Sequence, residues 1–154
     1  MTIKTANISD LDIIEKITQQ TISEIYPQYY SFGAVEFFIQ HHNTTNIKSD
    51  IKAGNVYIEY DDMNNAVGTV TVKENEICRL FVLPNQQGKG YGTKLIEFAE
   101  NSILDKYDKI ILDASLPAKR IYLKRHYKQT EYHIIETQNG DKLCYDVMEK
   151  NITK

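Results

Sequence analysis

The 154-residue chain has few of the residues that mark metal-bound or disulfide-linked proteins. Its two cysteines, Cys78 and Cys144, form no CxxC pair and no cluster with histidine, so neither a zinc site nor a disulfide framework is indicated. His41 and His42 are adjacent on an expected helix, and adjacent side chains cannot bind one metal ion in the i, i+4 manner. We therefore expect no metal site, buried thiols, and a packing or surface role for the two histidines.

Positive charge and long apolar segments are also scarce. The formal net charge is -3, so the chain has no surplus of lysine and arginine to neutralise a nucleic-acid backbone, although a local basic patch can still hold a small polyanion. No apolar run approaches the length of a membrane span. We expect a cytoplasmic, reduced protein without nucleic-acid or membrane partners.

No linker rich in proline, glycine or serine interrupts the chain, which indicates one domain over residues 1–150 and a short tail over 151–154. In the first third, Ser9 is the predicted N-cap of a helix that ends before Pro27. Two shorter helices should follow, the second ending at Gly54. The apolar residues that recur at helical spacing in the first helix are Leu11, Ile14, Ile17, Ile22 and Ile25.

The middle of the chain changes to the period of strands. Residues 56–60, 66–73 and 76–82 read as antiparallel neighbours joined by polar turns. A loop, a helix, a short apolar strand over 110–112, a helix over 118–125 and a hairpin turning at Asn139-Gly140 complete the order. This order predicts an α/β (α+β) domain with a mixed, mostly antiparallel central sheet flanked by helices.

The most informative stretch is Gln87-Gly88-Lys89-Gly90-Tyr91-Gly92-Thr93, which follows a strand and opens a helix. A helix start leaves backbone N–H groups without partners, and these together with the helix dipole attract phosphate oxygens. Glycine allows a close approach of the anion and tolerates positive φ. Lys89 adds a positive charge. The stretch predicts a pyrophosphate site.

Three other interpretations of this loop have less support from the sequence. A Walker loop requires Gly-x-x-x-x-Gly-Lys-Ser/Thr, which is absent. A dinucleotide fingerprint requires a third glycine where Thr93 stands and an early βαβ unit, whereas apparent hairpins precede this loop. The third interpretation is a glycine-rich turn that binds nothing, although alternating glycines reduce stability through backbone entropy.

Two motifs, taken in order, resemble the GCN5-related N-acetyltransferase (GNAT) superfamily. Gln87-Gly88-Lys89-Gly90-Tyr91-Gly92 is similar to its Arg/Gln-x-x-Gly-x-Gly/Ala motif, and Leu80-Phe81-Val82-Leu83-Pro84 is similar to the strand beside the pantetheine arm. The segment from Ala118 to Tyr127 resembles its Ala-x-x-x-Tyr-x-x-x-Gly-Phe motif. Two positions depart from the pattern: His126 replaces a glycine, and Ser115 replaces a frequent asparagine.

The resemblance implies an acyl-CoA N-acyltransferase fold with acetyl-CoA as co-substrate. Backbone groups of Leu80 and Val82 are expected to bind the pantetheine arm, and the loop amides with the Gln87 side chain are expected to bind the pyrophosphate. The residues expected to contact the coenzyme are Leu80, Phe81, Val82, Gln87, Gly88, Lys89, Gly90, Tyr91, Gly92, Thr93, Ser115 and Ala118.

Acetyl transfer to an amine requires a proton acceptor and a stabilised leaving thiolate. By resemblance Tyr122 is expected to hydrogen-bond the coenzyme sulfur, and Glu76 is the candidate base. Strand alternation predicts Glu76, Leu80 and Val82 on one face. The alternative interpretations are a packed helix tyrosine and a solvated carboxylate at a strand end.

The acceptor side is expected to include Tyr26, Tyr30 and Glu36, with core packing as the alternative for the aromatic rings. The predicted function is transfer of an acetyl group to a primary amine of a small molecule or peptide by direct attack, because no Cys–His nucleophile is present. The alternatives are a non-catalytic acyl-CoA sensor and transfer of a longer acyl chain. An exposed strand edge makes a homodimer possible.

Overall fold

The computed structural model describes residues 1–152, which form seven strands, five α-helices and three short 3-10 helices. The strands are β1 (Thr2–Thr5), β2 (Val56–Tyr60), β3 (Ala66–Lys73), β4 (Glu76–Val82), β5 (Lys109–Ala114), β6 (Lys128–Glu136) and β7 (Lys142–Asn151). The helices are α1 (Leu11–Ile25), α2 (Phe32–His41), α3 (Thr44–Lys52), α4 (Tyr91–Leu104) and α5 (Leu116–Lys124), with the 3-10 turns Ile8–Asp10, Tyr26–Gln28 and Pro84–Gln86.

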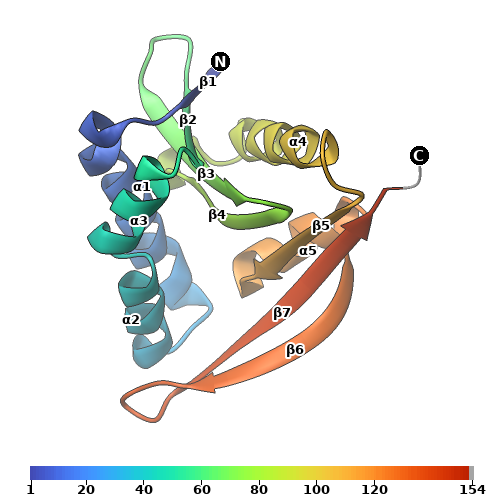
Figure 1. The fold of residues 1–154 in the computed structure, drawn as a ribbon. Coiled ribbons are helices and arrows are strands. Elements are labelled where there is room, and N and C mark those ends of the chain that lie inside the picture. The colour runs from blue at the N-terminus through green and yellow to red at the C-terminus, as the bar shows by residue number, and fades with distance from the viewer. Residues whose placement is uncertain (153–154) are drawn as a thin grey trace.

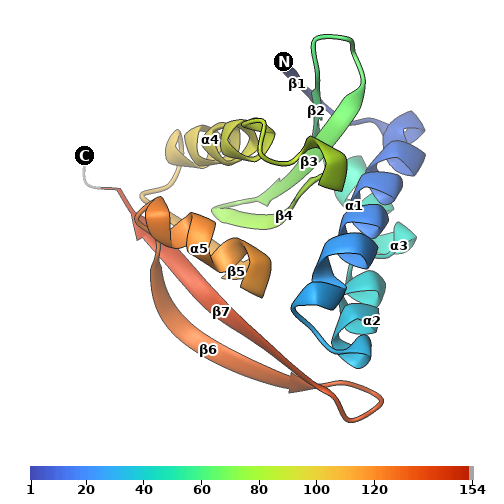
Figure 2. The same ribbon diagram turned by 180° about the vertical axis from the view of Figure 1, so that it is seen from behind.

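All seven strands belong to one twisted sheet in the order β1-β2-β3-β4-β5-β7-β6. Every neighbouring pair is antiparallel except β4 and β5, which are parallel. Helices cover both faces: α1 contacts β3 and β4 and packs with α2 and α3, whereas α4 and α5 contact the sheet from the other side (Figures 1 and 2). The predicted mixed, mostly antiparallel sheet flanked by helices is confirmed.

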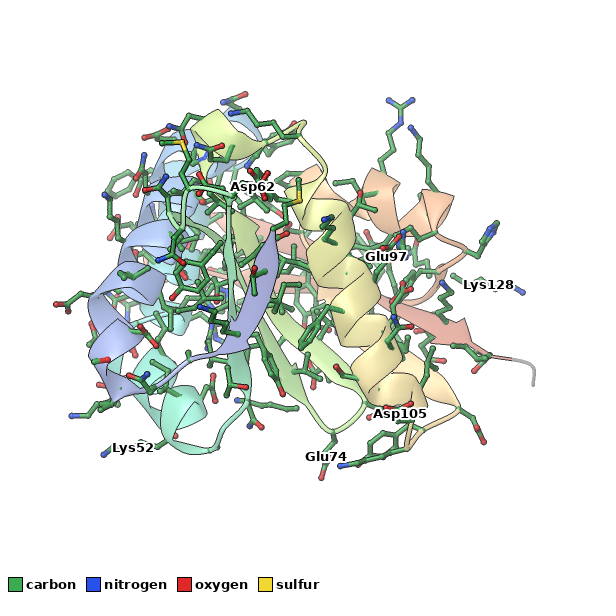
Figure 3. All side chains as sticks on the ribbon, turned by 90° about the horizontal axis from the view of Figure 1, so that it is seen from above. Lys52, Asp62, Glu74, Glu97, Asp105 and Lys128 are labelled. Atoms are coloured by element: carbon green, nitrogen blue, oxygen red, sulfur yellow. The ribbon has the colours of Figure 1, made fainter. Side chains whose placement is uncertain are left out.

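Apolar side chains from the middle of each element form the core. On the α4 side, Leu95, Ala99 and Ile103 of α4 pack on sheet residues such as Val70 and Leu112, all at most 1% exposed. Gly68 on β3 permits this close approach, because a Cβ built there would lie 2.8 Å from a Leu95 methyl carbon. Seen from above, the charged side chains labelled in Figure 3 lie on the periphery, away from this core.

The parallel pair β4 and β5 is joined over a very short length. Their register includes only Glu76 with Ile111 and Ile77 with Leu112. Beyond these pairs the two strands separate, and the arrows of β4 and β5 diverge in Figure 1. An opening is therefore built into the middle of the sheet, at the carboxyl ends of both strands.

A bulge in β4 corrects one prediction about side-chain direction. Thr71 of β3 pairs with Arg79, but the next residue, Val72, pairs with Ile77, so Cys78 is an extra residue on β4. One extra residue reverses the alternation of side chains. Glu76 therefore does not share a face with Leu80 and Val82, as strict alternation predicted.

Three smaller expectations also differ from the structure. The N-terminal cap is Asn7 rather than Ser9: the Asn7 side chain accepts the Ser9 N–H and Asp10 completes a capping box. Both cysteines are free, and both are half-buried instead of buried. The last strand extends to Asn151, one residue into the expected tail, and residues 153–154 of that tail lie outside the described part.

None of the helices in residues 1–152 combines the length and the apolar character that crossing a bilayer requires.

Candidate active site

The loop between β4 and α4 has the conformation that its glycines suggested. Gly88 and Gly90 have φ of 76° and 92°, in the left-handed region where a side chain would be strained. A Cβ added at either residue would meet no atom within 4 Å, so the space in front of the loop is open. Gly90 is also the N-cap residue of α4.

The amide groups of this loop are available to a ligand. The first amide of α4 with a backbone partner is that of Lys94, which donates to the Gly90 carbonyl at 3.2 Å. Within residues 1–152, no acceptor pairs with the six N–H groups from Gly88 to Thr93. Six free donors at the positive end of a 14-residue helix are suited to bind an anion.

Two polar side chains at the loop have partners within the protein. The Gln87 side-chain amide donates to the Val82 carbonyl at 3.0 Å, and Lys89 donates to the side chain of Gln86 at 2.9 Å. Gln87 was expected to reach the anion itself. Here its amide nitrogen holds the loop against the end of β4, so the backbone supplies the donors.

The free edge of β4 faces the opening. The Leu83 N–H donates to the Val67 carbonyl of β3 at 2.9 Å. In an antiparallel ladder, successive residues direct their backbone groups to opposite sides. Leu80 and Val82 therefore direct theirs away from β3, toward the side from which β5 has separated. Since Gln87 occupies the Val82 carbonyl, the Val82 N–H and both groups of Leu80 remain for an extended ligand.

Two cavities meet at this opening. One, of about 490 Å³, extends from the glycine loop, and the other, of about 520 Å³, extends between α2, α3, β4, β5 and β7. We call them the loop cavity and the α2 cavity. Both volumes are in the range of small-molecule sites. Six residues line both: Tyr26, Leu80, Phe81, Ser115, Ala118 and Tyr122.

Tyr122 is placed at this junction by α5. It is 6% exposed, and its hydroxyl has no hydrogen-bond partner among the described residues. Burial raises the pKa of this phenol well above its usual value, which keeps the hydroxyl protonated as a donor. Because Tyr122 lines both cavities and its hydroxyl has no acceptor among the described residues, the hydroxyl is suited to a ligand atom at the junction.

Ser115 and Tyr26 form the other side of the junction. Ser115 is the N-cap residue of α5, and its side chain lies near the Tyr26 hydroxyl, where it lowers the pKa of that phenol. Burial nevertheless raises the pKa of Tyr26. Tyr26 packs edge-on against Phe38 of α2 with ring centroids 4.8 Å apart. The expected placement of Tyr26 and Ser115 beside a ligand site is therefore consistent with both cavities.

Tyr30 and Glu36 are placed differently. The Tyr30 hydroxyl accepts the Leu116 N–H at 2.7 Å, which ties the segment before α2 to the first residue of α5. Glu36 is exposed on α2. Neither residue lines the loop cavity or the α2 cavity, so the direct ligand contacts expected of them are not part of this site.

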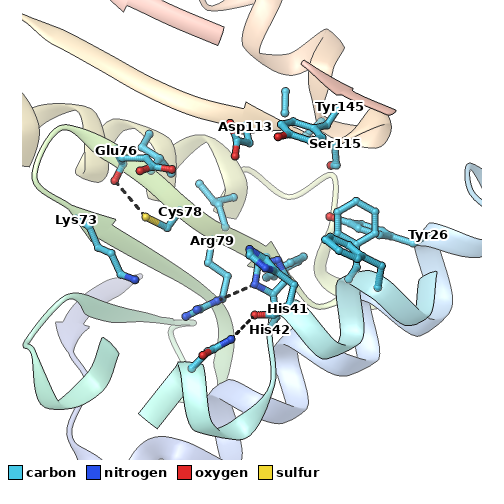
Figure 4. A pocket seen from close by; sticks show the side chains of 18 of the residues that line it. Tyr26, His41, His42, Lys73, Glu76, Cys78, Arg79, Asp113, Ser115 and Tyr145 are labelled. Atoms are coloured by element: carbon cyan, nitrogen blue, oxygen red, sulfur yellow. Dashed lines mark hydrogen bonds between the residues drawn. The ribbon is translucent and has the colours of Figure 1, made fainter. Parts of the chain in front are cut away.

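Two carboxylates lie at the far end of the α2 cavity. Figure 4 shows Glu76 on β4 and Asp113 on β5 there, with Ser115 and Tyr26 toward the junction. Burial and the neighbouring Asp113 raise the pKa of Glu76. Asp113 is exposed to solvent, and its partial desolvation in the cavity raises its pKa against the opposing effect of His133 and His41. No sequence motif marks Asp113, so its position in this cavity is known only from the folded structure.

A buried ion network forms the floor of this cavity. Arg79 donates to Asp50 at 2.7 Å and to the ring nitrogen Nδ1 of His42 at 3.1 Å, and Lys73 also contacts Asp50 at 2.7 Å. Burial and the adjacent arginine lower the pKa of His42 to about 3, so this ring stays neutral. His41 is exposed and stacks on Phe37. Within residues 1–152, no cluster of His, Cys, Asp and Glu has the arrangement of a metal site.

Comparison with protein families decides the identity. The model of the acetyltransferase (GNAT) domain matches residues 15–150, which is most of the chain. The protein belongs to the GNAT acetyltransferase family. It is therefore an acyltransferase, and its sheet is the GNAT sheet, with the opening between β4 and β5 at its centre. A comparison with curated protein sequences gave no match.

Solved GNAT structures share the fold at low identity. A GCN5-related N-acetyltransferase from Rhodopseudomonas palustris is 21% identical with a TM-score of 0.87, covering 98% of this chain and 95% of its own. A PaiA N-acetyltransferase from Thermoplasma acidophilum, solved with coenzyme A, is 18% identical (TM-score 0.71, 98% of both chains). YncA from Salmonella typhimurium, a putative acetyltransferase solved with acetyl-CoA, is 16% identical (TM-score 0.74, 100% and 95%).

One departure from the GNAT pattern is explained by the backbone. His126 stands where the family motif has glycine, and its φ is 71°. The turn after α5 therefore keeps a left-handed conformation although the residue is not glycine. Histidine is among the residues enriched there.

Proposed function

We propose that this GNAT protein transfers an acetyl group from acetyl-CoA to a primary amine by direct attack. The observation that carries the proposal is the set of six amides from Gly88 to Thr93 that have no partner within the described residues. Four of these residues, Gly88, Gly90, Gly92 and Thr93, line the loop cavity, which extends to Tyr122. The donor set suits a pyrophosphate, because it combines backbone N–H groups with a helix dipole. When bound, acetyl-CoA supplies the acetyl group and a thiolate leaving group.

The free edge of β4 supports a path for the pantetheine arm. An extended amide chain can add to a strand edge through main-chain hydrogen bonds. Leu80 offers its N–H and carbonyl, and Val82 offers its N–H. An N–H at this position also polarises a thioester carbonyl, as donors in an oxyanion hole do. In this proposal Phe81 and Ala118 close the junction from either side, and Ser115 and Tyr26 position the acetyl end.

Tyr122 is proposed to hydrogen-bond the developing thiolate. Reference pKa values of ~10 for a phenol and ~8.5 for a thiol already make full proton transfer unfavourable by about 2 kcal/mol. Burial raises the pKa of Tyr122 further, so a stabilising hydrogen bond is favoured over complete transfer. Its ring packs in the core, and its hydroxyl has no partner in the described part of the chain.

Glu76 is proposed to take the proton of the amine. An aliphatic ammonium has a reference pKa of ~10.4 and must lose a proton before it attacks. Glu76 lies four residues from Leu80, roughly 13 Å along the strand, so the proton reaches it through water in the α2 cavity. The raised pKa of its carboxyl favours acceptance of a proton.

The test is a transfer assay with acetyl-CoA and a panel of primary amines, in which free thiol is measured and the acetylated amine is identified by mass spectrometry. Amine-dependent release of thiol is expected. Binding of acetyl-CoA without turnover on any amine would instead identify an acyl-CoA sensor. A comparison of acetyl-CoA with longer acyl-CoA thioesters, by calorimetry and by turnover, tests the acyl preference.

A further inference from the structure

One buried histidine of the α2 cavity carries a ring proton whose position is fixed by its neighbours. Arg79 donates its Nε–H group to Nδ1 of His42 at 3.1 Å (Figure 4). An arginine side chain has donors only, so Nδ1 is the acceptor and carries no proton. Burial and the neighbouring Arg79 and His41 lower the pKa of this ring, so it stays neutral and its one proton is on Nε2.

The arginine that fixes this proton is itself held in place. Arg79 is 6% exposed, and its other nitrogens donate to the Thr71 hydroxyl at 3.1 Å and to Asp50 at 2.7 Å. Lys73 binds the second carboxylate oxygen of Asp50 at 2.7 Å. Partners on β3, α3 and the end of α2 thus hold the guanidinium. The His42 ring is therefore kept in one orientation, and the adjacent positive charge polarises its N–H group.

The Nε2–H group of His42 has no acceptor within residues 1–152. The enclosed side-chain atoms that lack a partner in this part of the chain belong to Thr18, Glu59 and Asp146, and Nε2 of His42 is not among them. The side chain is 8% exposed and lines the α2 cavity, so Nε2 is reached from the cavity. A fixed donor without an acceptor at the wall of a ligand cavity points to an oxygen atom of the ligand.

Phe81 separates this donor from the junction by one aromatic ring. His42 and Phe81 pack edge to face with centroids 5.6 Å apart, and the Phe81 centroid lies 6.3 Å from that of Tyr26. Phe81 and Tyr26 line both cavities. A small amine whose nitrogen lies at the junction therefore extends past Phe81 and brings an atom a few carbons away to His42.

The charges on the cavity wall favour an uncharged oxygen. Two cationic side chains, Lys73 and Arg79, line the cavity together with three carboxylates, those of Asp50, Glu76 and Asp113. A carboxylate on the ligand would add a fourth negative charge, whereas a hydroxyl or an amide carbonyl adds none. The donor on the histidine ring is neutral as well, so it suits a neutral acceptor.

We infer that His42 is a specificity-determining residue, which donates from Nε2 to an uncharged hydroxyl or carbonyl oxygen of the acceptor amine. This inference rests on the proposed function and assigns a further residue of the same site. His42 exchanges no proton and forms no covalent bond in the reaction. Its hydrogen bond contributes to binding of the acceptor.

Nitrogen NMR of the protein labelled with ¹⁵N-histidine tests the tautomer without any substrate. His42 should show a protonated Nε2 and an unprotonated Nδ1 at every pH between about 5 and 8. His42→Gln identifies its signals among those of the four histidines. A proton on Nδ1, or a ring that takes up a second proton in this range, would overturn the inference and leave the proposed function intact.

Steady-state kinetics at saturating acetyl-CoA then compare amines that differ in one group. Aminopropanol is paired with butylamine, aminobutanol with pentylamine and aminopentanol with hexylamine, so that each hydroxyl is matched by a methyl group. A fourth pair, γ-aminobutyramide and γ-aminobutyrate, compares an uncharged carbonyl with a carboxylate. The variants are His42→Phe, which removes the donor, and His42→Gln, which keeps an N–H group near the place of Nε2. His133→Gln is the control, because His133 is exposed and lines neither cavity.

In the wild type, at least one amino alcohol is expected to have a KM about fivefold below that of its methyl partner, and the amide is expected to have a lower KM than the carboxylate. His42→Phe should raise the KM of the oxygen-bearing amine alone, His42→Gln should keep part of the difference, and His133→Gln should behave as wild type. Denaturant unfolding checks each variant, because His42→Phe leaves the Arg79 Nε–H group without its acceptor. If that variant does not fold, His42→Gln and the tautomer decide.

Two kinds of failure are distinguishable. Equal KM values within every pair, an equal effect of His42→Phe on both members of a pair, or a lower KM for the carboxylate would overturn the inference while leaving amine acetylation in place. Absence of both coenzyme binding and transfer would overturn the proposed function, and the inference with it.

Discussion

The rings of Tyr122 and Tyr127 pack edge to face, with centroids 5.3 Å apart and planes inclined by 67°. The two hydroxyls differ: that of Tyr127 donates to Glu100 at 3.1 Å, whereas that of Tyr122 has no partner in the described residues and lies at the junction of the cavities. A substitution of either tyrosine by phenylalanine therefore keeps the ring packing and removes one hydroxyl, so the contribution of each hydroxyl can be measured separately.

Tyr122→Phe should lower kcat by roughly 10²-fold and leave the affinity for acetyl-CoA nearly unchanged, since the ring stays and only the donor to the thiolate is lost. Stopped-assay turnover and calorimetric titration measure the two quantities. Tyr127→Phe is the matched control: it should reduce the free energy of unfolding by about 1 kcal/mol with little change in kcat. A large loss of coenzyme affinity in Tyr122→Phe would contradict the assigned role.

Gly90→Val should abolish coenzyme binding, because the side chain would occupy the open space in front of the loop amides. Gly54→Val is the control, since Gly54 also has a positive φ of 77° and open space around a Cβ but lies in the turn after α3. Both variants carry left-handed strain of about 1–2 kcal/mol. Calorimetry should show binding lost only in Gly90→Val, and equal binding in both would rule out this loop.

Glu76→Gln should remove the acid limb of the pH–rate profile. In the wild type, kcat/KM rises with pH as the Glu76 carboxyl loses its proton, and the raised pKa moves this rise above the range of an ordinary glutamate. The variant has no such group, so kcat should fall by about 10²-fold and its profile should flatten on the acid side. Glu74→Gln, in the exposed β3–β4 turn, is the control. If the acid side of the pH–rate profile is unchanged in Glu76→Gln, another group must accept the proton of the amine.

Glu59 predicts a pH dependence of stability. It is 0% exposed, its two side-chain oxygens have no hydrogen-bond partner among residues 1–152, and burial raises its pKa to about 7. The unfolded value is ~4.3, so between these values the folded state holds a proton that the unfolded state lacks, and stability from this group falls as pH rises. Glu59→Gln should therefore be more stable than wild type by roughly 3 kcal/mol at pH 8, and the gap should close toward pH 4. Denaturant unfolding at both pH values measures the difference in free energy of unfolding between the variant and the wild type. A difference that does not change with pH would contradict the raised pKa of Glu59.

His126→Gly should stabilise the fold by about 0.5–1 kcal/mol, because φ of 71° is strained for histidine and only part of this gain is offset by glycine's greater unfolded-state entropy. Thermal unfolding gives the change. The contrasting variant is Lys124→Gly in the last turn of α5, where glycine should lower stability by up to about 1 kcal/mol. Destabilisation by both substitutions would show that His126 makes contacts that outweigh its strain.

The amino-acid sequence by itself determined the parts of the protein that depend on local pattern. Periodicity located the three central strands at the bounds that the structure has, and the glycine spacing identified a loop whose left-handed residues and free amides are local properties. The family resemblance of the loop and of the segment around Tyr122 is likewise carried by contiguous residues, and the family match confirms it.

Tertiary structure decided what depends on pairing between distant segments. The bulge at Cys78 arises from the register between β3 and β4, and it turns Glu76 to the other face, where simple alternation failed. Asp113 faces Glu76 only because β5 pairs with the start of β4 and then separates, and Tyr30 bonds Leu116 across 86 residues. Local patterns record the side-chain period of one strand, whereas strand register and strand separation are set by the packing of the whole sheet. The α2 cavity is therefore formed only in the folded chain.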